Sequence, residues 1–239
     1  MSGRSRQLLD EWFSDTGVGL SAEHGCFYKH PANLIDQIRT PERESSPSPP
    51  SSDTDPTEGT NPSQQPEFFR RKTNDGWIAL VDHVDSAWRE TIRPLFQHYT
   101  ERTPGSFIEE KEINLTWRYE SADPEFGAWQ AAELQVNLEK ILSHMAVSII
   151  LGNKTLELRP STVDKATAAR SILKDLNSPE ESDFLLCVGD GKTDEPVFTF
   201  LGEVEGSWTA TVGKKQTEAQ YYLEGVADVE GLVGGLAEC

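Results

Sequence analysis

Acidic side chains follow an apolar run at residues 184–195, and their spacing could bind a divalent cation. Residues 184–188 are five apolar residues without polar alternation, which predicts a fully buried strand. Gly189-Asp190-Gly191 predicts a tight turn, and Thr193 is a candidate N-cap for a helix with Asp194 in its first turn. Open α/β sheets bind ligands at the carboxyl ends of their strands, and carboxylate oxygens suit Mg²⁺. The pattern predicts a Mg²⁺ contact at Asp190 and Asp194, and the alternative is that these carboxylates only cap the helix.

The apolar periodicity predicts the elements that position these side chains. Residues 6–13 predict an amphipathic helix, and the helical spacing from Leu80 to Tyr99 predicts a second one that Pro94 kinks or divides. Between them, residues 41–66 hold seven of the fourteen prolines and no aliphatic or aromatic residue. Such a segment cannot bury enough apolar surface to offset its ordering entropy, so we expect a disordered insertion.

The pattern changes from helical to strand spacing at Arg102. Residues 113–119 alternate apolar and polar side chains, so one face of this strand should pack on helices and the other should be polar. Asp123-Pro124 predicts a helix start, and two apolar runs on either side of Gly152-Asn153 predict a hairpin. These elements predict a small α/β cap at residues 101–160.

Helical and buried-strand patterns return after the cap, so we expect residues 1–100 and 161–239 to form one core. Residues 163–176 predict a helix, residues 208–213 a strand and residues 228–236 a terminal helix. The expected architecture is an α/β core of Rossmann-like type that carries the cap between its two parts.

The composition excludes several classes of partner. A formal net charge of −18 argues against nucleic acid and anionic membranes. No signal peptide and no long apolar run is present, so we expect neither secretion nor a membrane span. The cysteines Cys26, Cys187 and Cys239 are odd in number and lack metal-ligand spacing, which favours a reduced, cytoplasmic setting.

Several segments resemble the trehalose-6-phosphate phosphatases of the haloacid-dehalogenase superfamily. The turn after residue 188 resembles the fourth motif of this family. The end of its second core strand is matched by Ser2-Gly3-Arg4. A further family segment, Leu-Ser-Ala-Glu-His-Gly-Cys, is matched by residues 20–26. The resemblance covers about four-fifths of the chain and implies a haloacid-dehalogenase-like Rossmannoid core with a small α/β cap. The matching cap segments are Arg102-Thr103-Pro104-Gly105-Ser106, Leu115-Thr116-Trp117, Ala122-Asp123-Pro124-Glu125-Phe126-Gly127 and Leu156-Glu157-Leu158-Arg159-Pro160.

The resemblance also implies roles for individual side chains. In the core, Ser2 would contact the transferring phosphate, and Lys165 would match the lysine that neutralises the phosphoryl group. In the cap, Glu109, Lys111 and Glu157 would match residues that bind trehalose 6-phosphate. This assignment fits their chemistry, because carboxylates accept hydrogen bonds from sugar hydroxyls and the positive charge of a lysine attracts a phosphate.

Other positions depart from the family pattern. The 239 residues contain no Asp-x-Asp-Gly-Thr, which carries the nucleophile and a proton-shuttling aspartate in this family, so we expect the first core strand to be missing. Arg118 and Glu120 stand where the family has histidine and arginine, and Gly191 replaces an aspartate. A carboxylate at position 120 reverses the charge that would face a sugar phosphate. Without the partner aspartates, Mg²⁺ binding at Asp190 and Asp194 should be weak or lost.

Two functions are compatible with this mixture. The first is a trehalose-6-phosphate phosphatase-like domain that is non-catalytic as given, a regulatory or structural subunit whose partners are the other subunits of a trehalose-6-phosphate synthase complex, as in fungi. The second is a truncated but otherwise genuine Mg²⁺-dependent trehalose-6-phosphate phosphatase. We favour the first, because loss of a nucleophile costs orders of magnitude in rate. A generic sugar phosphatase is a weaker alternative, because the cap segments match at fixed intervals.

Overall fold

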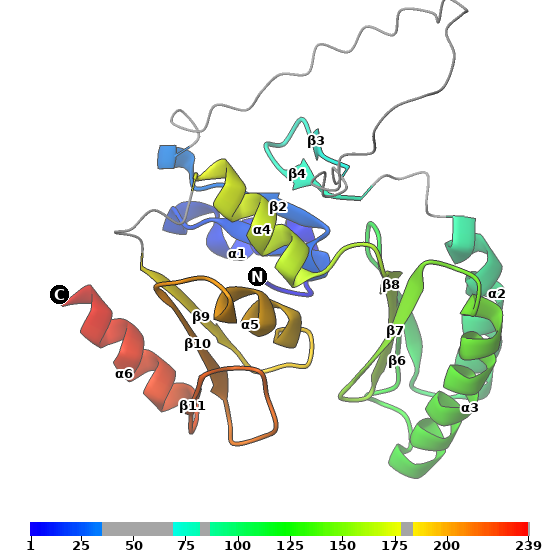
Figure 1. Ribbon diagram of the computed structural model, residues 1–239. Helices are drawn as coiled ribbons and strands as arrows, with labels where there is room; N and C mark the ends of the chain where they lie inside the picture. Colours follow the sequence, from blue (N-terminus) through cyan, green and yellow to red (C-terminus); the bar gives the residue numbers. More distant parts are fainter. Residues whose placement is uncertain (35–68, 82–86, 178–183, 239) are drawn as a thin grey trace, which may run out of the picture.

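The computed structural model describes residues 1–34, 69–81, 87–177 and 184–238, which form two units lying side by side (Figure 1). We call residues 87–160 the cap unit and the other described residues the core unit. The predicted insertion at residues 41–66 lies outside the described residues, as does Cys239, whereas Cys26 and Cys187 carry free thiols. In the described part of the chain, no helix is long and apolar enough to cross a membrane.

An antiparallel sheet in the order β1-β2-β4-β3 forms one layer of the core unit. The first helix begins after Ser5, whose hydroxyl accepts the Leu8 N–H. Leu80 and Val81, which the sequence assigned to a helix, instead pack beside Trp77 in the hydrophobic cluster of this layer, and that part of the prediction is wrong. The elements are α1 (Arg6–Phe13), η1 (Ser14–Thr16), β1 (Leu20–Ala22), η2 (Glu23–Gly25), β2 (Phe27–Lys29), η3 (Ala32–Leu34), β3 (Arg71–Lys72), β4 (Ile78–Ala79) and α4 (Lys165–Asp175).

A parallel sheet in the order β11-β10-β9 forms the other layer of the core unit. The prediction of a fully buried strand at residues 184–188 is wrong, because β9 is only partly buried and Phe184 is 58% exposed. The physical reason is its position: among the described strands β9 pairs only with β10, so it lies at the sheet edge. The elements are β9 (Leu185–Gly189), α5 (Glu195–Gly202), β10 (Ser207–Val212), β11 (Tyr221–Leu223) and α6 (Val226–Ala237).

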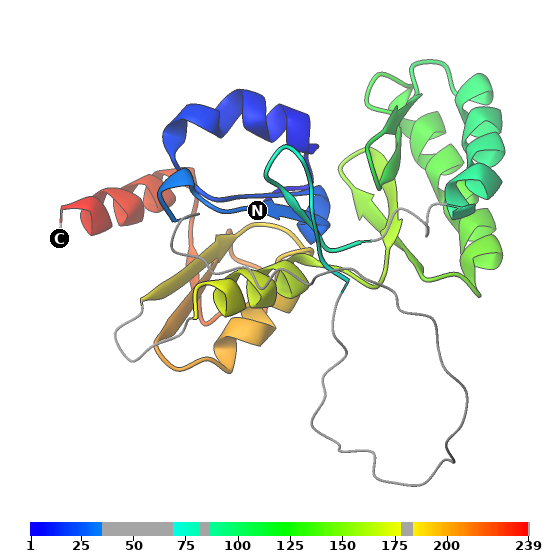
Figure 2. The same ribbon diagram turned by 90° about the horizontal axis from the view of Figure 1, so that it is seen from above.

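The cap unit is an antiparallel sheet in the order β5-β6-β8-β7, covered on one face by two helices. The helices lie on the side away from the core unit, so the uncovered face of the sheet is turned towards it (Figures 1 and 2). Apolar side chains of β6 and β8, such as Trp117 and Leu158, pack with Ile92 and Leu134 of the helices. The elements are α2 (Ala87–Arg102), β5 (Phe107–Glu110), β6 (Leu115–Arg118), α3 (Pro124–Leu142), β7 (Val147–Gly152) and β8 (Thr155–Pro160).

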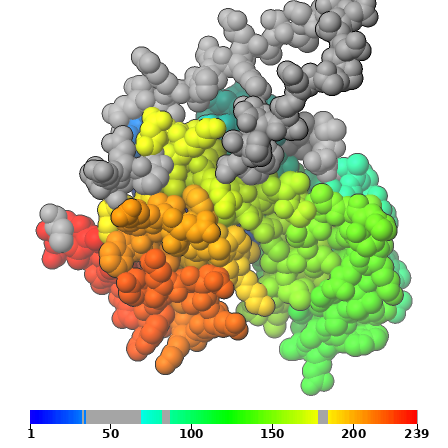
Figure 3. Space-filling view, in the orientation of Figure 1, coloured from blue at the N-terminus to red at the C-terminus, as the bar shows by residue number. Residues whose placement is uncertain are grey.

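The packing of α2 changes the expected arrangement of the chain. The sequence assigned residues up to 100 to the core, yet Trp88, Phe96 and Tyr99 of α2 are buried against the cap sheet. Pro94 lies inside α2 and does not divide it. The predicted hairpin is confirmed, since β7 and β8 pair antiparallel around the turn at residues 153 and 154. In the space-filling view the green cap unit adjoins the yellow and orange part of the core unit (Figure 3).

Candidate functional site

A buried lysine–aspartate pair joins the start of α4 to the turn after β9. The Asp164 side chain accepts the Thr167 N–H at 2.7 Å and caps α4, which places Lys165 at the first helical position. Lys165 is only 7% exposed, and its Nζ lies 2.6 Å from Asp194 Oδ1. The other carboxylate oxygen of Asp194 accepts the Gly191 N–H at 2.9 Å. Asp194 therefore neutralises Lys165 and makes no side-chain cap on α5.

The side chains around this turn offer few candidate ligands for Mg²⁺. Both carboxylate oxygens of Asp194 already accept hydrogen bonds, one of them from the Lys165 cation. Asp190 is exposed, and its carbonyl accepts a hydrogen bond from Lys215. In the described ranges, no group of three or more His, Cys, Asp and Glu side chains could hold a metal ion. Mg²⁺ takes six oxygen ligands and often keeps several waters beside one or two carboxylates, and among these residues Asp190 would be the carboxylate that could contact it.

Ser2 lies in a segment that is fixed against the core sheet by its backbone. Its N–H donates to the Ser21 carbonyl at 2.8 Å, and its carbonyl accepts the His24 N–H at 3.0 Å. Its Oγ accepts the Arg4 N–H at 3.1 Å. The next residue, Gly3, is so close to the imidazole of His24 that a Cβ would lie 2.4 Å from Nε2. A larger residue at position 3 would displace that ring.

The cap carboxylate Glu157 is held from both units. Lys111 Nζ lies 2.9 Å from its Oε1, and His24 Nε2 lies 3.1 Å from its Oε2. All three side chains are between 8% and 12% exposed. Burial raises the pKa of Glu157, but the hydrogen bond from His24 and the charges of His24 and Lys111 outweigh it and lower the pKa to about 2. Glu157 is therefore ionised at neutral pH.

Arg118 pairs with two carboxylates on the same unit. Its Nε lies 2.6 Å from Glu109 Oε2, and its Nη1 donates to Glu120. Burial lowers the pKa of Arg118, and the two carboxylates more than offset this effect and raise it. The negative charge of Glu120, which the family resemblance predicts to face a sugar phosphate, is thus balanced inside the cap unit. Glu109 lies on the same sheet face as Glu157, because the strand register aligns both with Thr116.

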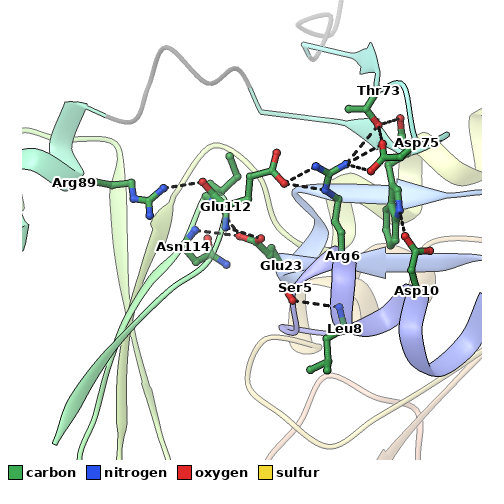
Figure 4. A network of polar contacts seen from close by, with 12 residues as sticks. Ser5, Arg6, Leu8, Asp10, Glu23, Thr73, Asp75, Arg89, Glu112 and Asn114 are labelled. Carbon is green, nitrogen blue, oxygen red and sulfur yellow. Dashed lines mark hydrogen bonds and ion pairs between the residues drawn. The ribbon is translucent and has the colours of Figure 1, made fainter.

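Glu23 is a fully buried carboxylate that joins the core unit to the cap unit (Figure 4). Its Oε2 accepts the N–H groups of Ile113 and Asn114 at 2.9 and 3.1 Å, and its Oε1 accepts the Glu112 N–H at 3.1 Å. Burial raises the pKa of Glu23, although these donors and the charge of Lys111 oppose the shift. The three hydrogen bonds fix the loop before β6 on the core unit.

Two arginines converge on the same loop (Figure 4). Arg6 of α1 contacts Glu112 Oε2 through Nη2 at 2.5 Å and Asp75 Oδ2 through Nη1 at 3.0 Å. Arg89 of α2 donates to the Glu112 carbonyl at 2.7 Å. The guanidinium of Arg6 also lies over the Phe27 ring, 4.5 Å from its centroid. The junction between the units is therefore charged, hydrogen-bonded and partly buried.

The structure brings some of the predicted site residues together and adds others. Lys165 contacts Asp194, and Lys111 contacts Glu157, whereas Glu109 pairs with Arg118 elsewhere on the cap sheet. Sequence reasoning assigned no role to Glu23 or to the ring of His24. Their partners lie about 90 and 133 residues further along the chain, as the separations of the Glu23–Ile113 and His24–Glu157 contacts show, so no local pattern indicates them.

An α/β core with a lysine–aspartate pair after β9, beside a cap sheet whose charged face is turned towards it, defines a phosphatase-like domain of the haloacid-dehalogenase type. The chain belongs to the trehalose-phosphatase family, whose model matches residues 1–227. It is 34% identical over 234 residues to the UDP-forming alpha,alpha-trehalose-phosphate synthase A of Dictyostelium discoideum, covering 98% of this chain and 25% of that protein. It is also 34% identical over 248 residues to the trehalose-phosphatase of Schizosaccharomyces pombe, covering 99% and 25%. The chain thus spans about a quarter of the length of these relatives.

Solved structures share this fold. The C-terminal domain of Candida albicans trehalose-6-phosphate phosphatase superposes with a TM-score of 0.72 at 28% identity, covering all of this chain and 77% of that one. The C-terminal domain of the Candida albicans trehalose synthase regulatory protein superposes with a TM-score of 0.61 at 17% identity, covering 96% and 78%, which shows the fold alone. The expected haloacid-dehalogenase-like fold and the family are confirmed. Phosphatases of this superfamily generally use Mg²⁺.

Proposed function

We propose that this trehalose-phosphatase-like domain recognises trehalose 6-phosphate between its core unit and its cap unit. The observation that carries the proposal is a pair of buried lysine–carboxylate contacts, Lys165–Asp194 in the core and Lys111–Glu157 in the cap. Lys165 in the core unit and Lys111 in the cap unit each offer a positive charge to a phosphate. Glu157, with Glu109 on the same sheet face, offers hydrogen-bond acceptors to sugar hydroxyls. That face of the cap sheet is turned towards the core unit (Figure 1).

We further propose that the 239-residue chain binds this ligand without hydrolysing it. Phosphoryl transfer in this family begins on an aspartate of Asp-x-Asp-Gly-Thr, which the sequence does not contain. Asp194 is a poor substitute, because both of its carboxylate oxygens are engaged by Lys165 and the Gly191 N–H. Mg²⁺ would bind weakly or not at all, since Asp190 is the one predicted ligand whose carboxylate stays uncommitted.

The biological role that follows is regulatory or structural, in the cytoplasm. Its partners would be subunits of a trehalose-6-phosphate synthase complex. This role is supported by the similarity to a trehalose-phosphate synthase of Dictyostelium.

The alternative is a truncated but otherwise genuine Mg²⁺-dependent trehalose-6-phosphate phosphatase. It is favoured by the presence of Ser2, Lys165 and Asp190, which would match phosphate and metal contacts of the family. In that case the missing chemistry would be restored by adding the Asp-x-Asp-Gly-Thr strand before Ser2.

Calorimetric titration of the chain with trehalose 6-phosphate tests the recognition proposal. Lys111→Met should weaken binding about tenfold or more, because a hydrogen bond to a charged group is removed from a nearly buried position. Lys140→Met, on the exposed surface of α3, is the matched control and should bind like the wild type. A wild-type chain that binds glucose 6-phosphate as tightly as trehalose 6-phosphate would refute disaccharide recognition.

Phosphate release from trehalose 6-phosphate in the presence of Mg²⁺ separates the two candidate functions. We expect no release above the uncatalysed rate. Release that disappears in Asp194→Asn would refute the non-catalytic role and support the alternative enzyme.

A further inference from the structure

His24 lies where the two halves of the proposed site meet. Its backbone N–H donates to the Ser2 carbonyl, and its ring packs against Gly3, where a Cβ would lie 2.4 Å from Nε2. The same Nε2 lies 3.1 Å from Glu157 Oε2. This one residue therefore connects the core segment that carries Ser2 with the cap carboxylate.

The backbone at this position adopts a conformation that non-glycine residues rarely take. Glu23 and His24 have φ of 46° and 57°, in the left-handed region. The conformation persists because the Glu23 carboxylate accepts three backbone N–H groups of the cap, and because the His24 N–H bonds to Ser2. Strained residues of this kind gather where the direction of a side chain matters for function. Here the conformation aims the imidazole at Glu157.

The ring has one polar partner among the described residues. Glu157 is ionised and can only accept, so Nε2 of His24 carries the proton and donates it. Nδ1 is buried without a hydrogen-bond partner, so no second bond fixes the ring. The other oxygen of Glu157 is taken by Lys111. Loss of His24 would leave Oε2 of Glu157 with no donor from the described part of the core unit.

We propose that His24 is a positioning residue for the sugar half of the ligand, an inference that rests on the proposed recognition of a sugar phosphate. His24 orients Glu157 for the sugar hydroxyls and ties this carboxylate to the core segment of Ser2. It makes no contact with the phosphate, which the core cation Lys165 would attract. Affinity for the disaccharide therefore depends on His24, and affinity for inorganic phosphate does not.

Calorimetric titration of the full chain with trehalose 6-phosphate and with inorganic phosphate tests this role. His24→Ala should weaken binding of trehalose 6-phosphate about tenfold and leave phosphate binding unchanged. His24→Asn should lose as much, since asparagine tolerates positive φ but is too short to reach Glu157, which separates reach from backbone strain. His24→Gln keeps an N–H donor of similar reach and should recover most of the affinity. His98→Gln, on the exposed face of α2, is the control.

Two outcomes overturn the inference while the proposed function stands. One is wild-type affinity for trehalose 6-phosphate in His24→Ala and His24→Asn, and the other is an equal loss for both ligands. If the wild type itself does not bind trehalose 6-phosphate, the proposed function fails, and a double-mutant cycle in urea unfolding then decides about His24. The combined His24→Ala and Glu157→Gln variant should lose less stability than the sum of the single variants, and strict additivity would refute the contact itself.

Discussion

Acidification should remove the stabilising effect of Glu157 within a defined range of pH. Its carboxylate is 12% exposed, and its pKa falls from 4.5 to about 2 because His24 and Lys111 favour the charged form despite burial. Since the folded pKa is lower than the unfolded one, the stabilisation is complete above pH 4.5 and is lost as the pH falls toward 2. The full effect is about 3 kcal/mol, and about 1 kcal/mol of it is lost by pH 3.5.

The measurement is urea unfolding, followed by tryptophan fluorescence between pH 7 and pH 3.5, for the wild type and Glu157→Gln. The difference in unfolding free energy between the two proteins should shrink by about 1 kcal/mol over this range. Titration of Glu23 acts on both proteins alike and cancels in the difference. For Glu139→Gln, an exposed position on α3, the difference from the wild type should stay constant. A pH-independent difference for Glu157→Gln would show that its carboxylate is not held by His24 and Lys111.

Three further predictions concern the junction and the metal. Glu23→Gln should lower the free energy of unfolding in urea by about 2 kcal/mol. The reason is that an amide nitrogen would replace one of the two carboxylate oxygens that together accept three backbone N–H groups. Unchanged stability would contradict the role of Glu23 as a buried anchor. Gly25→Ala should lower the melting temperature, since φ is 103° and a Cβ would lie 2.2 Å from the Asp164 carbonyl oxygen. Gly202→Ala in α5 meets open space and should raise it slightly, so equal effects would refute the steric argument. Calorimetric titration with Mg²⁺ should show only weak binding, and tight stoichiometric binding that vanishes in Asp190→Ala would refute the incomplete site.

The cap elements could be predicted because their signals are local. Asp123 caps α3 by accepting the N–H groups of Glu125 and Phe126, as its place before a proline suggested. The hairpin of β7 and β8 likewise follows from two apolar runs around a short polar turn. The start of α2 could not be placed, because Leu80 and Val81 continue the helical spacing while they pack on the core sheet. Periodicity reports which residues are apolar and leaves open which partner buries them.

The site was predictable only in part, for a related reason. The apolar run at residues 184–188 predicts a strand, but the burial of this strand depends on whether a neighbouring strand lies on each side. The five residues assigned through family resemblance, and the metal contacts expected at Asp190 and Asp194, remain predictions as functional groups. The His24–Glu157 contact depends on two consecutive left-handed residues and on a separation of 133 residues. Side-chain patterns carry no information about either.

The hydrogen bonds from residues 112–114 to Glu23 affect how the cap unit can move relative to the core unit. Held at this loop, the cap unit would rotate about the loop more easily than it would slide past it. Lys111 is adjacent to this point, whereas Phe107 lies about 16 Å away along the strand, at about 3.3 Å per residue. A rotation of about 20° would move Phe107 by about 5 Å and Lys111 by about 1 Å. Rotation of the cap unit about this loop would thus move the outer end of β5 much further than Lys111, the residue beside the anchor.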